Sequence, residues 1–261
     1  MQNKKAIQAL QAPGPRWEVS TARARTIQEE LRKHWVGEDQ FGEIHTVAGL
    51  DASFVLVESQ AMDRRRPIRW NALRAANRAI GCVVLYRYPE MEEIERTYAV
   101  LRLKFPYVPG FLSFREIPVL LAALAKLKGL PDLLFCDGQG FAHPRRMGLA
   151  THLGIVLDRP TIGCAKSRLT GVYAEPGRNA SNWSPLFANT VKDEMIGMVV
   201  RTRNGVRPIY VSPGHRVGFE SALKLTLSVV DGRRIPRPIR DADRFASETK
   251  RQLLLSQLSE K

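Results

Sequence analysis

The chain has 261 residues, enough to bury a sizeable core, and its 40 Lys and Arg residues against 26 Asp and Glu give a net charge of +14. This balance favours a polyanionic partner, nucleic acid before a membrane, although a merely soluble basic protein has the same composition. No apolar run approaches the roughly 18 residues that cross a bilayer, and Lys4 and Lys5 precede no apolar signal segment, so we expect a cytoplasmic protein. Cys82, Cys136 and Cys164 lie in apolar runs without C-x-x-C spacing, which favours core thiols over disulfides or zinc.

The first half of the chain predicts an arm, a helix and three strands. We expect residues 1–19 to form an N-terminal arm and residues 20–258 to form a single domain, because no linker separates them. Ser20 can cap a helix that continues to about Trp35. Three strands follow, at about 44–57, 79–88 and 94–103, and their succession suggests an antiparallel meander.

An Arg-rich insertion at about residues 60–78 separates the first two strands. It holds Trp70 and six arginines: Arg64, Arg65, Arg66, Arg69, Arg74 and Arg78. One interpretation is a phosphate-contacting loop, with Arg64, Arg65 and Arg66 as the candidates, and the other is a solvated surface insertion.

The middle of the chain predicts a stiff loop followed by a βαβ unit. Two prolines fix the loop of residues 106–111, which presents Tyr107. Ser113 is expected to cap a helix to about Lys128, with Glu116 at capping-box spacing. A buried strand at 133–137 ends on Asp137 before a Gly-x-Gly turn, and a helix at 145–157 and a strand at 161–166 follow, so these strands should be parallel.

The last third predicts a mostly irregular stretch at 168–187 and a hairpin of strands at 195–202 and 207–212, joined through Asn204-Gly205. Gly214-His215 then leads into a helix at about 217–230, and a charged helix follows at about 241–258. The fold class is therefore α/β, with a mixed sheet that combines an antiparallel meander and parallel strands and is flanked by helices.

Three acids stand at related places in this plan. Asp51 interrupts the first strand, Glu116 opens a helix, and Asp137 ends the central strand. A meander followed by a helix and a parallel strand brings the first strand beside the fourth, so the three carboxylates should converge. Converging carboxylates favour a hard cation such as Mg²⁺ or Mn²⁺, and in a basic chain that indicates phosphodiester cleavage. The alternatives are a solvated edge acid, a helix cap and a turn residue, respectively.

Five motifs resemble those of the endonuclease V family. They are VAGLD at 47–51, PYVPGFLSFRE at 106–116, CDGQG at 136–140, HPRRMGLATHLG at 143–154 and IGCAKS at 162–167. The resemblance covers about residues 21–244 and implies a ribonuclease H-like fold. It also implies nicking of DNA at the second phosphodiester bond 3′ to deoxyinosine, which leaves 3′-hydroxyl and 5′-phosphate ends. Some members act on RNA. The Arg-rich insertion is longer than the resemblance leads us to expect.

The resemblance also implies roles for individual residues. Asp51, Glu116 and Asp137 match metal-binding acids, which would hold Mg²⁺ with Mn²⁺ as a substitute, and His215 matches a histidine near them. Lys166 matches a lysine that stabilises the attacking water or the phosphate, although locally it reads as a surface lysine. Tyr107 matches an aromatic wedge that fills the space left by the base, although it could be a lid on the core. The substrate pocket would be formed by Gly110, Leu112, Gly138, Gly140, His143 and Leu169.

We therefore expect a monomeric Mg²⁺-dependent endonuclease that repairs deoxyinosine in DNA. One alternative is an endoribonuclease that acts mainly on inosine-containing RNA, because the pocket and the wedge could serve both polymers. The other is a nucleic-acid-binding protein that keeps the fold without catalysis, against which the three acids argue.

Overall fold

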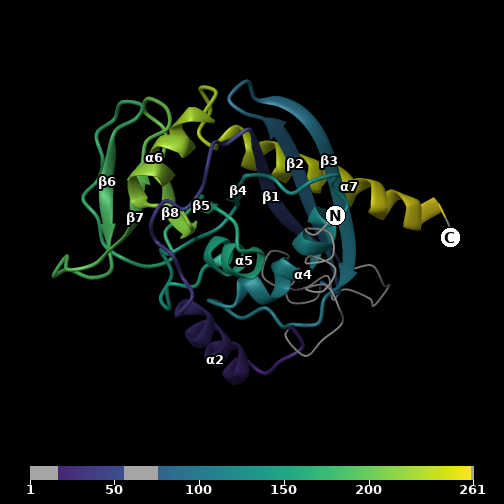
Figure 1. Ribbon diagram of the computed structural model, residues 1–261. Coiled ribbons are helices and arrows are strands. Elements are labelled where there is room, and N and C mark those ends of the chain that lie inside the picture. The colour runs from purple at the N-terminus through teal and green to yellow at the C-terminus, as the bar shows by residue number, and fades with distance from the viewer. Residues whose placement is uncertain (1–16, 56–75, 260–261) are drawn as a thin grey trace, which may run out of the picture.

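The computed structural model describes residues 17–55 and 76–259, and within them the chain builds one mixed sheet flanked by helices (Figure 1). The strands are β1 (Thr46–Val55), β2 (Arg78–Arg87), β3 (Glu92–Arg102), β4 (Leu133–Cys136), β5 (Thr161–Ala165), β6 (Trp183–Phe187), β7 (Met195–Val200) and β8 (Ile209–His215). These described strands form an eight-stranded sheet in the order β3-β2-β1-β4-β5-β8-β7-β6. Arg64, Arg65, Arg66 and most of the predicted arm lie outside the described residues.

Strand directions agree with the predicted plan. β1, β2 and β3 form the antiparallel meander. β4 runs parallel to β1 on one side and to β5 on the other, with Leu50 opposite Cys136. β8 then pairs with β5 in the opposite direction, and β7 and β6 continue antiparallel. The predicted mixed α/β sheet is confirmed, and the carboxyl ends of β4 and β5 share one edge.

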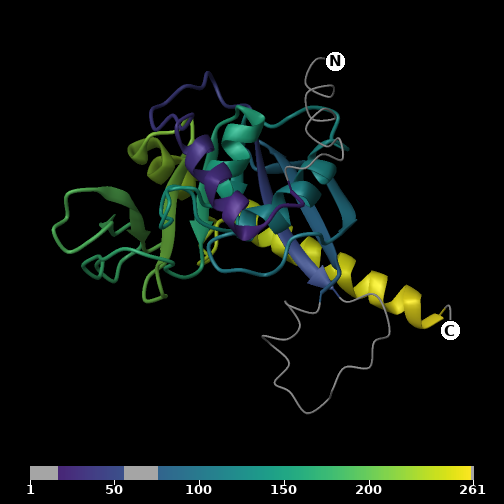
Figure 2. The same cartoon turned by 90° about the horizontal axis from the view of Figure 1, so that it is seen from below.

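Two helical layers cover the sheet (Figures 1 and 2). α4 (Leu112–Leu124) and α5 (Leu149–Leu157) pack on one face, where Leu134 and Cys136 join their core. α6 (Phe219–Ser228) and α7 (Arg237–Ser259) cover the other face, where Leu133 and Phe135 point. This alternation along β4 is the two-residue period of a strand buried on both faces. α2 (Thr21–Arg32) packs outside α5.

Glycines in the strands let both helical layers approach closely. A Cβ atom at Gly49 would lie 1.9 Å from the Pro238 carbonyl oxygen at the start of α7, and one at Gly81 would lie 2.7 Å from the Val119 carbonyl oxygen in α4. Neither position could carry a larger side chain without moving a helix backbone. The glycines therefore fix the two helices that bring acids to the sheet edge.

Several predicted boundaries are wrong. α4 begins after Phe111, so Ser113 lies within its first turn, and the Ser113 hydroxyl contacts His152 Nδ1 at 2.9 Å instead of forming a capping box. α5 begins at Leu149 rather than 145, because the preceding residues form a turn in which Arg146 has φ 58°. β8 extends to His215, β6 occupies part of the stretch expected to be irregular, and α7 starts at Arg237.

Other expectations hold for the described residues. The Ser20 side chain accepts a hydrogen bond from the Arg23 amide at the start of α2. Cys82, Cys136 and Cys164 are buried and free, as core thiols should be. Among the described helices, none has the length and apolar character needed to cross a membrane.

Candidate active site

The edge where β4 ends brings three acids together. Asp51 follows Leu50 on β1, and the Asp137 amide donates to the Leu50 carbonyl at 3.1 Å, so the two aspartates leave neighbouring strands at the same level. Glu116, in the first turns of α4, is 6% exposed and lies close enough that the Asp51 and Asp137 charges act on it. The structure thus places Asp51, Glu116 and Asp137 in one cluster.

Burial and mutual repulsion raise the pKa of each of these carboxyl groups. For Asp51, burial is the largest cause of the raised pKa, followed by the charges of Asp137 and Asp243. For Glu116, burial again leads, followed by Asp51 and Asp137. Burial raises the pKa of Asp137 as well, although Lys166 opposes the rise. Carboxylates that destabilise one another's charge are suited to a cation that would relieve the repulsion.

Lys166 lies within this cluster, just after β5. Its Nζ is 2.6 Å from Asp137 Oδ2 and 3.1 Å from Asp243 Oδ2. Burial disfavours the ammonium, but the two carboxylates outweigh that effect and raise the pKa of Lys166. The lysine is therefore a held, charged group beside the acids and not a free surface side chain.

Asp243 is the member of the cluster that sequence reasoning missed. It comes from α7, on the face of the sheet opposite Glu116, and its charge raises the pKa of both Asp51 and Asp137. The sequence carries a weak signal for it, because the glycine at position 49 indicates close packing against β1 without saying what packs there.

A cavity of about 430 Å³ adjoins the acids. Asp137 and Lys166 line it, together with five of the six predicted pocket residues: Gly110, Leu112, Gly138, His143 and Leu169. The expectation for Gly140 is wrong, because its amide donates to Ser212 Oγ and a Cβ there would lie 2.2 Å from the Pro213 carbonyl oxygen. Gly140 instead lets the turn after β4 pack against β8.

Tyr107 forms one wall of the cavity. The tyrosine is half-buried and lines the cavity, with the Arg115 guanidinium 5.9 Å from its ring centroid. It is therefore placed to meet a group that enters the cavity. Leu169, 47% exposed, stands at the rim.

His143 forms part of the cavity wall as a neutral ring. The Arg145 amide donates to Nδ1, so Nε2 carries the proton and donates to the Gly110 carbonyl at 3.1 Å. Burial, assisted by the Arg145 charge, lowers the pKa of His143 to about 4. The ring thus acts at neutral pH as a hydrogen-bond donor that shapes the wall.

The structure does not bring His215 to the acids. β8 is antiparallel to β5, and His215 pairs with Thr161, where β5 begins, whereas Lys166 follows the other end of β5. His215 Nδ1 accepts from the Val36 amide, and Nε2 lies 3.4 Å from Asp158 Oδ1. The expectation that His215 lies near the three acids is therefore wrong.

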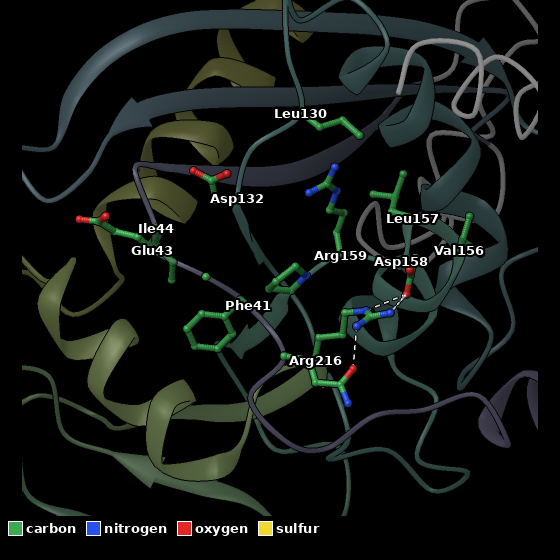
Figure 3. Close-up of a pocket in the computed structure, with 13 residues that line it drawn as sticks. Phe41, Glu43, Ile44, Leu130, Asp132, Val156, Leu157, Asp158, Arg159 and Arg216 are labelled. Carbon is green, nitrogen blue, oxygen red and sulfur yellow. Dashed lines mark hydrogen bonds and ion pairs between the residues drawn. The ribbon is translucent and has the colours of Figure 1, made fainter. Parts of the chain in front are cut away.

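A larger cavity, of about 650 Å³, lies at that other edge of the sheet (Figure 3). Three of its charged residues are engaged in structural contacts. Arg216 bonds Asp158 and Gln40. Asp132 accepts from the Thr46 amide and hydroxyl. The charged residues of the lining mix three acids, Glu43, Asp132 and Asp158, with Arg159 and Arg216 rather than gathering one sign. The smaller cavity beside the acids is the better candidate site.

The acid cluster fits a hard divalent cation by its donor chemistry, since it offers carboxylate oxygens that repel one another. As the side chains stand, no group of three His, Cys, Asp or Glu residues within the described ranges is arranged so that it could hold a metal ion. The Lys166 ammonium, 2.6 Å from Asp137, supplies positive charge at this place.

Known proteins resemble this chain along most of its length. The family profile described as Endonuclease V matches residues 68–244. Endonuclease V from Roseiflexus sp. (strain RS-1) is 42% identical over 231 residues, 88% of this chain and 94% of that protein. Endonuclease V from Nostoc sp. (strain PCC 7120) is 43% identical over 232 residues, 88% of this chain and 96% of that one.

Solved structures agree in fold. Endonuclease V from Streptomyces avermitilis superposes with a TM-score of 0.77 at 35% identity, covering 90% of this chain and 95% of that one. Ciona intestinalis endonuclease V, in complex with a 24mer DNA containing an inosine followed by a ribo-adenosine, gives 0.72 at 27% identity, covering 89% and 98%. The predicted ribonuclease H-like fold is confirmed by these neighbours.

Proposed function

The chain belongs to the endonuclease V family, and from this premise we propose that it is a metal-dependent endonuclease that repairs deaminated bases in DNA. Its substrate would be a strand containing deoxyinosine, nicked at the second phosphodiester bond on the 3′ side to leave a 5′-phosphate end. The similar Ciona protein bound to inosine-containing DNA supports the substrate class. We also propose that the protein acts as a monomer, because the acids, Lys166 and the cavity all come from one chain.

One observation carries this proposal. Asp137 and Lys166 belong to the acid cluster and also line the cavity, so a base held in the cavity would bring the adjoining backbone of its strand to the acids. The cavity volume of about 430 Å³ falls in the range typical of small-ligand sites, about 300–1,000 Å³. An enzyme that does chemistry near an altered base needs this juxtaposition of base pocket and phosphate site.

The acids and the lysine have separate tasks. Asp51, Glu116, Asp137 and Asp243 would hold Mg²⁺, for which Mn²⁺ could substitute. The bound ion would supply electrophilic stabilisation of the phosphoryl oxygens. The Lys166 ammonium, held by Asp137 and Asp243, would stabilise the negative charge that develops on the phosphate during attack.

The cavity walls would select the base. Tyr107 would stack in the space that an extruded base leaves, since stacking on an aromatic ring is worth about 1–3 kcal/mol per base. The backbone exposed at Gly110 and Gly138, with the neutral His143, would border the extruded base. Recognition and cleavage would then depend on different side chains.

The test is a nicking assay on a duplex with a single deoxyinosine, with and without Mg²⁺. We expect the wild-type protein to cut only with the metal, and Asp137→Asn or Asp51→Asn to abolish cutting while binding largely survives. Asp243→Asn should also slow cutting strongly. Asp158→Asn is the matched control, because this aspartate lies at the other edge of the sheet and pairs with Arg216. A variant that retains more than about a tenth of the wild-type rate, ~1.4 kcal/mol in barrier, would remove its residue from the catalytic set.

A second candidate is cleavage of inosine-containing RNA. The ribo-adenosine after the inosine in the Ciona complex favours testing it. Matched DNA and RNA strands, which differ in the 2′-hydroxyl, would separate the two activities. Absence of metal-dependent cutting on both would favour a non-catalytic binding protein.

A further inference from the structure

Gln28 is a fully buried polar side chain that connects α2 to the loop ending at Gly110 and to the turn at residues 145–147. It lies on α2 with 0% of its surface exposed. Its Nε2 donates to the Gly110 carbonyl at 3.2 Å and the Met147 carbonyl at 3.3 Å, and its Oε1 accepts from Arg145 Nε at 2.6 Å. Gly110 and Met147 line the cavity beside the acids, whereas Gln28 stands behind them. Every polar group of the amide is thus used to connect cavity walls.

Gly110 is the point where these contacts meet. Its φ of +80° is a left-handed conformation that favours glycine, and its carbonyl also accepts from Arg145 Nη2 at 2.6 Å and from His143 Nε2 at 3.1 Å. The Arg145 guanidinium lies 4.3 Å from the Phe111 ring centroid, so the next residue is held as well. The direction of one peptide group is therefore fixed by donors from α2 and from the turn after β4.

The loop that carries Tyr107 needs such anchors. Pro106 and Pro109 have no amide hydrogen, so this segment cannot be tied into a sheet by regular backbone bonds. At its start, Arg115 Nη1 donates to the Phe105 carbonyl at 2.9 Å. At its end, the Phe111 amide donates to the Val108 carbonyl at 3.1 Å, and the contacts on Gly110 add to this bond, so Tyr107 stands between two attachments. Releasing Gly110 would free the end of the loop that closes against the cavity.

We propose that Gln28 is a positioning residue for base recognition, which fastens the Tyr107 loop to the wall formed by residues 143–147 so that the cavity exists before nucleic acid binds. The inference rests on the proposed function. A preformed cavity avoids the cost of ordering the loop on binding. Among the described residues, two hydrogen bonds of Gln28 go to carbonyls of the cavity wall, the third comes from Arg145, and none goes to the acids. Gln28 therefore acts on selectivity rather than on the cleavage step.

Two variants separate this role from general stability. Gln28→Met keeps the length of the side chain and removes all three hydrogen bonds. Gln28→Glu keeps an acceptor for Arg145 but turns a carboxylate oxygen toward the Gly110 and Met147 carbonyls. Thr226→Val is the matched control, because Thr226 is equally buried but lies on α6, where its hydroxyl contacts Cys164.

The measurements are single-turnover cutting of strands with inosine or adenine at one position, and thermal unfolding of each variant. We expect both Gln28 variants to lose at least tenfold in inosine-over-adenine selectivity. Their rate at saturating enzyme on a strand with an unpaired inosine should stay within about threefold of wild type. Thr226→Val should keep full selectivity even if its Tm falls. Selectivity within twofold of wild type in a folded Gln28→Met would overturn the inference.

Amide hydrogen exchange of Gln28→Glu gives a second measurement that needs no cutting. We expect exchange of the Phe111 amide, which donates to the Val108 carbonyl at 3.1 Å, to rise at least tenfold, with the exchange of the middle of α4 unchanged. Unchanged exchange in the loop would overturn the inference even if Gln28→Met does not fold. If the wild-type protein cuts no inosine-containing strand, the proposed function fails, and the exchange result alone decides whether Gln28 fastens the loop.

Discussion

Replacing Gly49 with Ala tests how α7 delivers Asp243 to the acid cluster. The added Cβ would stand 1.9 Å from the Pro238 carbonyl oxygen and 2.1 Å from its carbon. Ordinary carbon contacts begin near 3.4 Å, so β1 and α7 must separate by about 1.5 Å. Because the obstacle is backbone, no side-chain rotation can relieve it.

The size of the effect follows from this overlap. Overpacking of a buried position costs about 1–3 kcal/mol, and in a chain of this size that lowers Tm by roughly 2–12 °C. Asp243 lies five residues after Pro238 on α7, with its Oδ2 3.1 Å from Lys166 Nζ. A misplacement of about 1 Å at a catalytic group can cost about 100-fold in rate. We therefore expect cutting to fall by one to two orders of magnitude at a temperature where the variant is folded.

The assay pairs thermal unfolding with single-turnover nicking at 25 °C, and Gly129→Ala is the control because nothing lies within 4 Å of a Cβ there. The control should match the wild type in both measurements. A normal Tm for Gly49→Ala would refute the close packing of α7 on β1. A lowered Tm with a normal rate would show that the position of Asp243 does not matter for cleavage.

Three further predictions concern other parts of the molecule. Tyr107→Ala should weaken discrimination of inosine from adenine more than it slows cutting at saturating enzyme, and equal losses on flipped-out and fully paired lesions would count against a wedge. Replacing Arg64, Arg65 and Arg66 by Ala, all outside the described residues, should flatten the slope of log K against log salt by about 0.7–0.9 per lost phosphate contact and leave inosine selectivity unchanged. An unchanged slope would show that these arginines contact solvent or a partner and not the DNA phosphates. Burial, followed by the charge of His143, lowers the pKa of His152 to about 3 in the folded protein. Between about pH 6.5 and pH 3, His152 is therefore protonated in the unfolded chain but not in the folded one. The free energy of unfolding should fall as pH drops toward 3, and in denaturant titrations at several pH values His152→Gln should lessen that fall.

The sheet and the first three acids could be predicted because their signals are local or follow from chain order. The run from Leu133 to Cys136 is apolar on both faces and ends on Asp137, as expected of an interior strand. Once β1 and β4 are parallel neighbours with Leu50 opposite Cys136, Asp51 and Asp137 lie side by side at the carboxyl end of β4.

Local patterns failed where a tertiary contact uses the same atoms. Ser113 and Glu116 have the spacing of a capping box, but the Ser113 hydroxyl meets His152 from α5, and Glu116 turns into the acid cluster. The four residues from Ser113 to Glu116 include neither His152 nor the other acids, so these contacts cannot be predicted from that stretch alone. The pattern therefore predicted that a helix starts nearby, but not the hydrogen bonds at its start.

His215 and Asp243 show a different limit, which is set by the directions of elements far apart in the chain. A motif near the end of a strand can stand at either edge of the sheet, and β8 runs opposite to β5, so His215 falls at the edge away from Lys166. α7 crosses behind β1 instead, and it brings a carboxylate within 3.1 Å of Lys166 from a segment that reads only as a charged helix. Both outcomes depend on which way the chain runs after β5, and no local residue pattern encodes that direction. The close approach at Gly49 is the feature of the motif at 47–51 whose residue type indicates that a backbone packs against β1, and that backbone belongs to the helix carrying the fourth acid.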